Sequence, residues 1–288
     1  MKKRERVTIG HLWGAFYPTI MYLLITVIAG IILVLVEKRV IVENGSINIE
    51  AIDQNMSLII TFFGALITAP LLIVIKYYDV KKQRMIGAYG YKSEFFLKYL
   101  LIIPFAVTFM YAANMLVTIV EKLLPSIAHS FDETAKAIYG ANIAIQIITA
   151  VILGPIVEEL IFRGLMYIRL KRMFGTGVAA FVTGLIFGLY HGNVSQGIYA
   201  FVFSYGAIFI YEKYKKIYAP IIMHMVANGV SVLVSFVLKD YNTSTGSATA
   251  SISEKTEWAS TILVFALSVA LCAVFALLIK KCVHPRKK

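Results

Sequence analysis

The feature that most constrains the fold is a series of apolar segments, each about as long as a membrane is thick. They comprise residues 12–36, 57–75, 97–120, 141–165, 177–193, 196–211, 218–238 and 260–279. About 20 apolar residues cross the hydrocarbon core as an α-helix, because a helix satisfies its own backbone hydrogen bonds there. The sequence therefore predicts an all-α, polytopic membrane protein with about eight transmembrane helices.

The distribution of basic residues indicates how these segments cross the membrane. With the amino terminus in the cytoplasm, most of the 28 Lys and Arg residues fall at the cytoplasmic ends of the segments, as the positive-inside rule describes. We therefore expect both termini to be cytoplasmic, in the plasma membrane of a bacterium. The same distribution argues against nucleic-acid binding despite the net charge of +12. Basic residues beside membrane spans face anionic lipid headgroups, and no nucleic-acid recognition motif accompanies them.

The chain is expected to form a single transmembrane domain over residues 1–288. No repeat and no long polar linker divides it. Its charged residues make up 15% of the chain, against about a quarter in soluble proteins, which favours a membrane domain. The first apolar segment is too long for a signal-peptide core and lacks a clear cleavage site. We therefore expect that segment to be retained as the first helix.

Three ionisable side chains interrupt the fourth apolar segment, where each costs a few kcal/mol to insert. On an α-helix, Glu159 and Arg163 are four apart and share a face, which predicts an ion pair. Glu158 is five positions before Arg163, about 140° around the helix, and is expected to remain available for chemistry. A purely structural cluster of all three charges is the alternative. Pro155, one turn earlier, is expected to kink the helix, beside either a hydrated cavity or a packing contact.

Two further pairs of polar or aromatic residues have helical spacing. Phe187 and His191 share a face of the fifth segment, and His224 and Asn228 share a face of the seventh. In an antiparallel hairpin, His191 would lie at nearly the depth of Glu158. His224 and Asn228 could donate hydrogen bonds to a carbonyl oxygen that gains charge, or could contribute to a metal site. A buried histidine can also be only a hydrogen-bonded core residue.

The order of these motifs resembles that of a known family, the CAAX protease and bacteriocin-processing (CPBP) family, also called Abi. Its pattern is Glu-Glu-x-x-x-Arg, then Phe-x-x-x-His, then His-x-x-x-Asn, on successive membrane helices. In this chain the motif residues are Glu158 and Glu159 with Arg163, Phe187 with His191, and His224 with Asn228. The resemblance covers about residues 140–235. It implies an eight-helix intramembrane endopeptidase.

The resemblance also implies a role for each motif residue. Glu158 would activate a water molecule with the assistance of His191, while His224 and Asn228 would stabilise the oxyanion. The supporting residues would be Glu159, Arg163 and Phe187.

The sequence itself requires no cofactor. Members of this family are often treated as metalloproteases, and a metal-free glutamate mechanism is also proposed for them. If a divalent metal such as zinc is present, Glu158, His191 and His224 are its candidate ligands. The amide of Asn228, in place of a second histidine, favours hydrogen bonding over zinc ligation.

The expected substrate is a membrane-associated peptide or protein, such as a pheromone or bacteriocin precursor, rather than a prenylated protein. A non-catalytic bacteriocin-immunity or regulatory membrane scaffold of the same fold is the main alternative. Binding alone would not require both Glu158 and His191, which weighs against that alternative. A transporter with Glu158 as a proton relay is a third hypothesis, and the absence of inverted repeats disfavours it.

Overall fold

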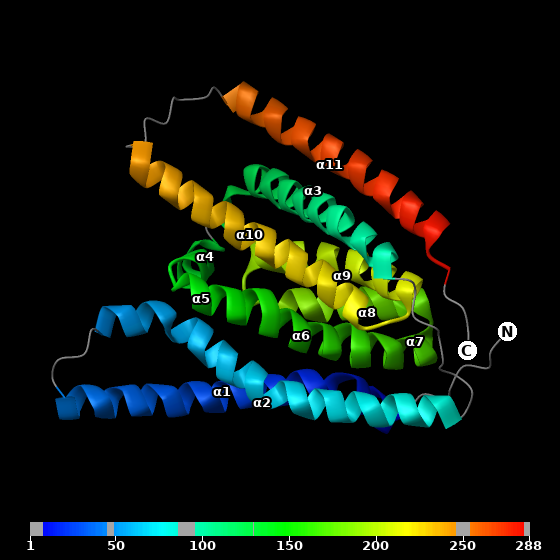
Figure 1. Ribbon diagram of the computed structural model, residues 1–288, viewed down its shortest axis with the longest axis horizontal. Coiled ribbons are helices and arrows are strands. Elements are labelled where there is room, and N and C mark those ends of the chain that lie inside the picture. The colour runs from blue at the N-terminus through cyan, green and yellow to red at the C-terminus, as the bar shows by residue number, and fades with distance from the viewer. Residues whose placement is uncertain (1–7, 45–48, 86–95, 129, 246–253, 285–288) are drawn as a thin grey trace. The chain divides into compact units, whose positions relative to one another are not determined.

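The computed structural model describes residues 8–44, 49–85, 96–128, 130–245 and 254–284, and this part of the chain is helical without strands (Figure 1). Seven of its helices are long and apolar enough to cross a membrane: Ile9–Glu37, Asn55–Lys82, Phe96–Leu123, Ile143–Phe174, Val194–Tyr214, Tyr218–Leu238 and Lys255–Cys282. The segment expected at 177–193 forms a shorter apolar helix, Thr176–Tyr190. The prediction of an all-α, multi-pass membrane protein is confirmed.

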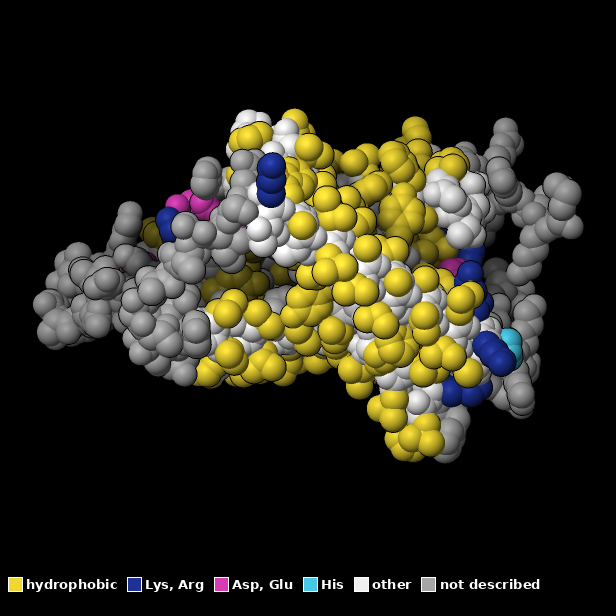
Figure 2. Space-filling model, turned by 90° about the horizontal axis from the view of Figure 1, so that it is seen from above, with side chains coloured by type: hydrophobic (Ala, Val, Ile, Leu, Met, Phe, Trp, Pro, Cys, Tyr) yellow, Lys and Arg dark blue, Asp and Glu magenta, His cyan; other side chains and the backbone are white. Residues whose placement is uncertain are grey.

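Hydrophobic side chains cover most of the face seen in Figure 2. Many large apolar residues are exposed on the long helices, including Leu24, Ile73, Leu233, Leu263 and Leu277. Water would make such a surface unstable, whereas lipid chains solvate it. The exposed surface therefore agrees with the membrane assignment.

The chain divides into two compact units, residues 1–89 with 133–179 and residues 90–132 with 180–288. A single domain over the whole chain stays a prediction. The helices of unit 1 are α1 (Ile9–Asn44), α2 (Ile49–Met85), α4 (Asp132–Tyr139), α5 (Ile143–Ile145), η3 (Gln146–Leu153), α6 (Gly154–Glu159), η4 (Leu160–Tyr167) and α7 (Ile168–Phe174). Those of unit 2 are η1 (Phe96–Leu101), α3 (Ile102–Leu123), η2 (Pro125–Ile127), most of α8 (Thr176–Tyr190), α9 (Val194–Tyr214), α10 (Tyr218–Thr245) and α11 (Glu254–Cys282).

In unit 1, helices α1 and α2 pack against each other and against the helix that carries the two glutamates. The contact between α1 and α2 is close at Gly64, where a Cβ atom would lie 2.4 Å from Thr26 Oγ1. Small residues permit such approach between membrane helices, where dispersion contacts rather than the hydrophobic effect hold helices together. Both helices contain a proline, Pro18 and Pro70, without interruption of the helix.

The helix with the two glutamates is not a uniform α-helix. Gln146–Leu153 and Leu160–Tyr167 are π-helical, and only Gly154–Glu159 between them is α-helical. Gly154 N donates to Thr149 O, which is the i→i−5 bond of the wider turn. Pro155 has no N–H and its ring crowds the preceding turn, so a widened turn just before it relieves the clash. The helix type thus changes next to Pro155, where the sequence predicts a kink, and the kink itself stays a prediction.

In unit 2, α3 packs against α9, α10 and α11. At Gly206 of α9, an added Cβ would lie 2.8 Å from Met223 Cε and 2.9 Å from Phe109 Cζ, so α9 lies close to both α10 and α3. Helix α8 is shorter than predicted because Gly192, with φ +74°, takes the left-handed backbone conformation just after its end. This early end places His191 at the start of a short turn before α9.

Candidate active site

The predicted ion pair in the acidic motif is present and fully buried. Arg163 Nη1 donates to Glu159 Oε1 at 2.8 Å, and both side chains are 0% exposed. The α-helical turn that ends at Glu159 and the π-turn after it place both residues in the interior of unit 1. Burial of a single charge at this position would cost several kcal/mol, and pairing offsets that cost. The pair is therefore part of the structural core of unit 1.

Glu158, by contrast, is half-buried. Electrostatic attraction to Arg163 involves Glu159 first and Glu158 to a smaller degree. The two carboxylates therefore differ in how strongly each attracts Arg163. The predicted angle of about 140° between Glu158 and Arg163 assumed an α-helix throughout. In the i→i+5 turns that follow Leu160, residues five apart become neighbours. Glu159 forms the direct ion pair, and Glu158 lies within longer-range attraction of the same guanidinium.

In unit 2, a hydrogen bond to the backbone fixes the imidazole of His191. Its Nδ1 lies 2.8 Å from the carbonyl oxygen of Phe187, four residues earlier. A carbonyl can only accept, so Nδ1 carries the hydrogen, and the neutral ring keeps its lone pair on Nε2. The predicted pairing of positions 187 and 191 on one helix face is present. The ring is oriented so that Nε2 can accept a proton.

The ring of Phe187 brings the second and third motifs together. It makes edge contacts with His191, at 4.9 Å between ring centroids, and with His224, at 6.1 Å. Phe203 of α9 contacts the His224 ring from another helix at 4.9 Å. Phe187 and Phe203 are each 1% exposed and His224 is 6% exposed. Asn228, one turn beyond His224 on α10, is half-buried, and aromatic packing orients the ring of His224.

The turn after His191 is held by capping contacts. Asn193 is the N-cap of α9: its Oδ1 accepts from Gln196 N at 2.8 Å, and its Nδ2 donates to Gln196 Oε1 at 2.9 Å. Asn193 Nδ2 also lies 3.4 Å from the carbonyl oxygen of His191. The Asn-x-x-Gln spacing is a capping-box pattern. The sequence reasoning missed it, although that spacing was visible.

A second anchor of this turn could not have been found from spacing. Ser195, 3% exposed at the start of α9, donates from Oγ to Glu121 Oε1 at the end of α3. Its backbone N–H donates to Ser130 Oγ at 3.1 Å, and the two hydroxyls lie 2.9 Å apart. Helices far apart in sequence thus hold the segment that follows His191. We regard Glu121, Ser130 and Ser195 as positioning residues.

An apolar groove lies beside the same turn. It has a volume of about 570 Å³ between α8 and α9, and its lining includes Phe181, Leu185, Leu189, Ile198 and Phe201. Gly192 and Asn193 also line it. An apolar groove adjacent to His191 suits the side chains of a peptide segment that lies in a membrane.

The groove depends on close contact between α8 and α9 at glycine. A Cβ on Gly188 would lie 2.7 Å from the carbonyl oxygen of Gly197. We expect Gly188→Ala to lower the free energy of unfolding by about 1–3 kcal/mol, since backbone atoms cannot yield to an added methyl group. Thermal unfolding in detergent measures this loss. Gly177→Ala, at a position with nothing within 4 Å, is the matched control and should change stability by no more than about 0.5 kcal/mol. Equal stability of the two variants would contradict the close contact.

A metal site within one unit would require several ligand side chains close together. Among the described residues of either unit, no three His, Cys, Asp or Glu side chains cluster so as to hold a metal ion. Catalytic zinc sites use three protein ligands. The candidate zinc ligands Glu158, His191 and His224 belong to both units, and their role in metal binding stays a prediction.

Comparisons with known proteins point to the segment that carries the three motifs. Residues 140–230 match the family model described as type II CAAX prenyl endopeptidase Rce1-like, and this range contains every motif residue predicted above. The putative membrane peptidase YdiL of Bacillus subtilis (strain 168) is 28% identical over 92 residues, which are 32% of this chain and 38% of that protein. The matched part thus spans well under half of the relative. No solved structure matches the chain. The predicted resemblance to the CPBP family is confirmed over this segment.

Proposed function

We propose, from the family resemblance confirmed over residues 140–230, that this membrane protein is an intramembrane endopeptidase. Its substrate would be a membrane-associated peptide or protein, and its location the plasma membrane of a bacterium. The name of the matched relative, a membrane peptidase, supports the same reaction class. The apolar groove beside His191 supports a substrate that enters from the membrane.

One observation carries the proposal above the others: the ring of Phe187 contacts both His191 and His224. Two of the three motifs, on helices separated by α9, therefore converge in unit 2. A packing role would require neither a backbone-fixed imidazole nor a second buried histidine against the same ring. Such convergence of titratable groups with fixed orientation is typical of a catalytic site.

In the proposed reaction, Glu158 takes a proton from water as the water oxygen attacks the peptide carbonyl carbon. His191 Nε2 assists by accepting a hydrogen bond from the same water. The carbonyl oxygen becomes an oxyanion, to which His224 and the amide of Asn228 donate hydrogen bonds. The C–N bond then breaks, and the proton held by Glu158 passes to the departing amine. A carboxyl and an amine product result, and Glu158 is ionised again.

Cleavage of peptides by the purified full chain tests the proposal. We expect wild-type protein in detergent–lipid micelles to cleave some members of a set of single-span membrane peptides, with fragments identified by mass spectrometry. His191→Ala should lose about 10²–10⁴-fold in rate, the usual contribution of a group in proton transfer, with its thermal unfolding retained. His11→Ala, at an exposed histidine of α1, is the control. Equal cleavage rates in wild type and His191→Ala would exclude His191 from proton transfer, whereas no cleavage by wild type would favour the non-catalytic scaffold.

Addition of a chelator to the same assay tests whether cleavage requires a divalent metal. In the glutamate mechanism we expect cleavage to survive prolonged chelation, with elemental analysis to confirm that less than stoichiometric zinc remains. Loss of activity on chelation, with recovery on addition of zinc, would contradict the metal-free mechanism. It would assign Glu158, His191 and His224 as ligands of a metal that activates water.

A further inference from the structure

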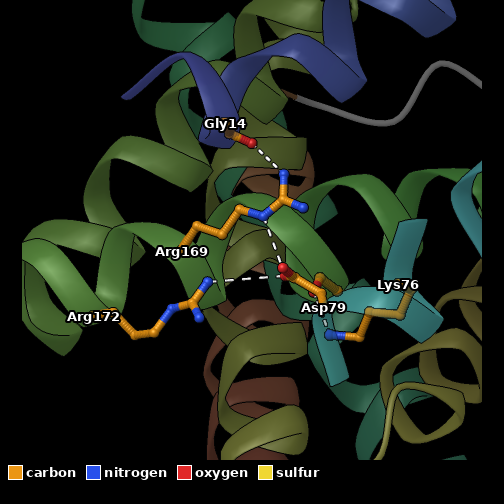
Figure 3. A network of polar contacts seen from close by, with 6 residues as sticks. Gly14, Lys76, Asp79, Arg169 and Arg172 are labelled. Atoms are coloured by element: carbon orange, nitrogen blue, oxygen red, sulfur yellow. Dashed lines mark hydrogen bonds and ion pairs between the residues drawn. The ribbon is translucent and has the colours of Figure 1, made fainter. Parts of the chain in front are cut away.

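A cluster of charged residues lies at the ends of α2 and α7 in unit 1, apart from the proposed catalytic residues (Figure 3). It contains three cations, Lys76, Arg169 and Arg172, and one carboxylate, Asp79. Lys76 is 8% exposed, and the ionisable groups that act on it are the other three members. The side chains of Asp79 and Arg169 are 16% and 12% exposed, and that of Arg172 is 29% exposed. The cluster is thus largely covered, with Arg172 at its open side.

The contacts of this basic cluster leave positive charge unbalanced. Asp79 Oδ2 is shared by Arg169 Nε at 3.2 Å and Arg172 Nη2 at 3.8 Å. Arg169 Nη1 donates to the carbonyl oxygen of Gly14, and Lys76 Nζ to that of Gly164, as Figure 3 shows for Arg169. Backbone carbonyls accept hydrogen bonds but carry no net charge. One carboxylate therefore faces three cations.

Arg172 also retains an unused donor. Its Nε is buried and has no hydrogen-bond partner among the described residues. Its contact with Asp79, at 3.8 Å, is too long for a hydrogen bond. An arginine fork in this state matches the oxygens of a phosphate, to which two parallel N–H groups can donate. Such a phosphate would balance one or two of the excess charges.

The position of the cluster indicates where that phosphate comes from. Candidate spans Asn55–Lys82 and Ile143–Phe174 end beside it, so it lies near the membrane interface on the side predicted to be cytoplasmic. Lys81 and Lys82, both exposed, continue the basic surface along α2. Basic pockets between the cytoplasmic ends of membrane helices attract anionic headgroups. We propose that the basic cluster binds the phosphate of an anionic phospholipid headgroup and thereby ties α2 to α7.

Lipid titration of the full chain in detergent, followed by native mass spectrometry, tests this site. We expect wild-type protein to retain phosphatidylglycerol at least about tenfold more tightly than phosphatidylcholine, and Arg172→Gln to lose most of that preference, since a charge-assisted bond contributes about 1.5–3 kcal/mol. Lys171→Gln removes the same charge from the same helix, but its ammonium lies over the Tyr167 ring instead. This control should keep the preference. Equal retention of both lipids by wild type, or equal loss in both variants, overturns the proposal.

A second variant and a titration with inorganic phosphate complete the test. If Arg172→Gln does not fold, Arg172→Lys is measured instead. It keeps the charge but loses the two parallel N–H donors of arginine, and it should lose part of the preference for phosphatidylglycerol. Inorganic phosphate is titrated while thermal unfolding is followed. Stabilisation of wild type by millimolar phosphate, without any by phosphatidylglycerol, would keep the phosphate site but assign it to a soluble anion. No stabilisation by either, in wild type, overturns it.

Discussion

Replacement of Glu158 by Gln is expected to lower the rate of peptide cleavage by about 10²–10⁴-fold, the range that a general base contributes. Glutamine has nearly the same shape and can still hydrogen-bond, but it cannot accept the proton of the attacking water. Glu158 is half-buried, and the fully buried ion pair with Arg163 is formed by Glu159. The folded state should therefore tolerate the change. Initial rates measured by mass spectrometry, with unfolding temperature measured in parallel, separate chemistry from stability.

Glu133→Gln is the matched control for this variant. It makes the same chemical change in unit 1, at a side chain that is 89% exposed and forms an ion pair with exposed Lys136. Its cleavage rate should equal that of wild type. If Glu158→Gln retained more than about a tenth of the wild-type rate, Glu158 would not be the base, because a positioned base contributes at least about 10²-fold.

The predictable part of the fold is the part that membrane physics fixes locally. Each of the eight apolar segments is largely helical in the structure, and seven of these helices are long and apolar enough to span a membrane. Helix type and packing were not predictable in the same way. The π-turns around Pro155 depend on how a crowded turn relaxes. The division into two units depends on contacts between helices, which hydropathy does not encode.

The site shows the same contrast between local and long-range information. Spacing of four residues correctly predicted the Glu159–Arg163 pair, and also the Phe187–His191 contact, although His191 lies just beyond the end of α8. The contact of Phe187 with His224 joins two helices, and spacing within one helix cannot predict it. Anchoring of the turn by Ser195 involves residues of three separate segments, so no periodicity could reveal it.

Replacement of Arg163 by Met is expected to cause the largest loss of stability among the motif positions. It removes the guanidinium of a pair in which both side chains are 0% exposed and leaves the carboxylate of Glu159 buried. Loss of one partner of a buried pair costs about 3–5 kcal/mol. Thermal unfolding in detergent should show a decrease of roughly 6–20 °C, at about 2–4 °C per kcal/mol for a chain of this size class. Lys136→Met, in an exposed pair with Glu133, should cost at most about 1 kcal/mol.

The double variant Glu159→Leu with Arg163→Met separates the charge from the packing. Since it buries no uncompensated charge, most of the lost stability should return, as buried pairs replaced by apolar residues are often neutral. Equal stability of Arg163→Met and Lys136→Met would contradict a structural role for the pair. Stability recovered together with cleavage would assign Glu159 and Arg163 to holding the helix that presents Glu158. Recovered stability without cleavage would mean that Arg163 also acts on Glu158, through the longer-range attraction that their spacing across a π-turn allows.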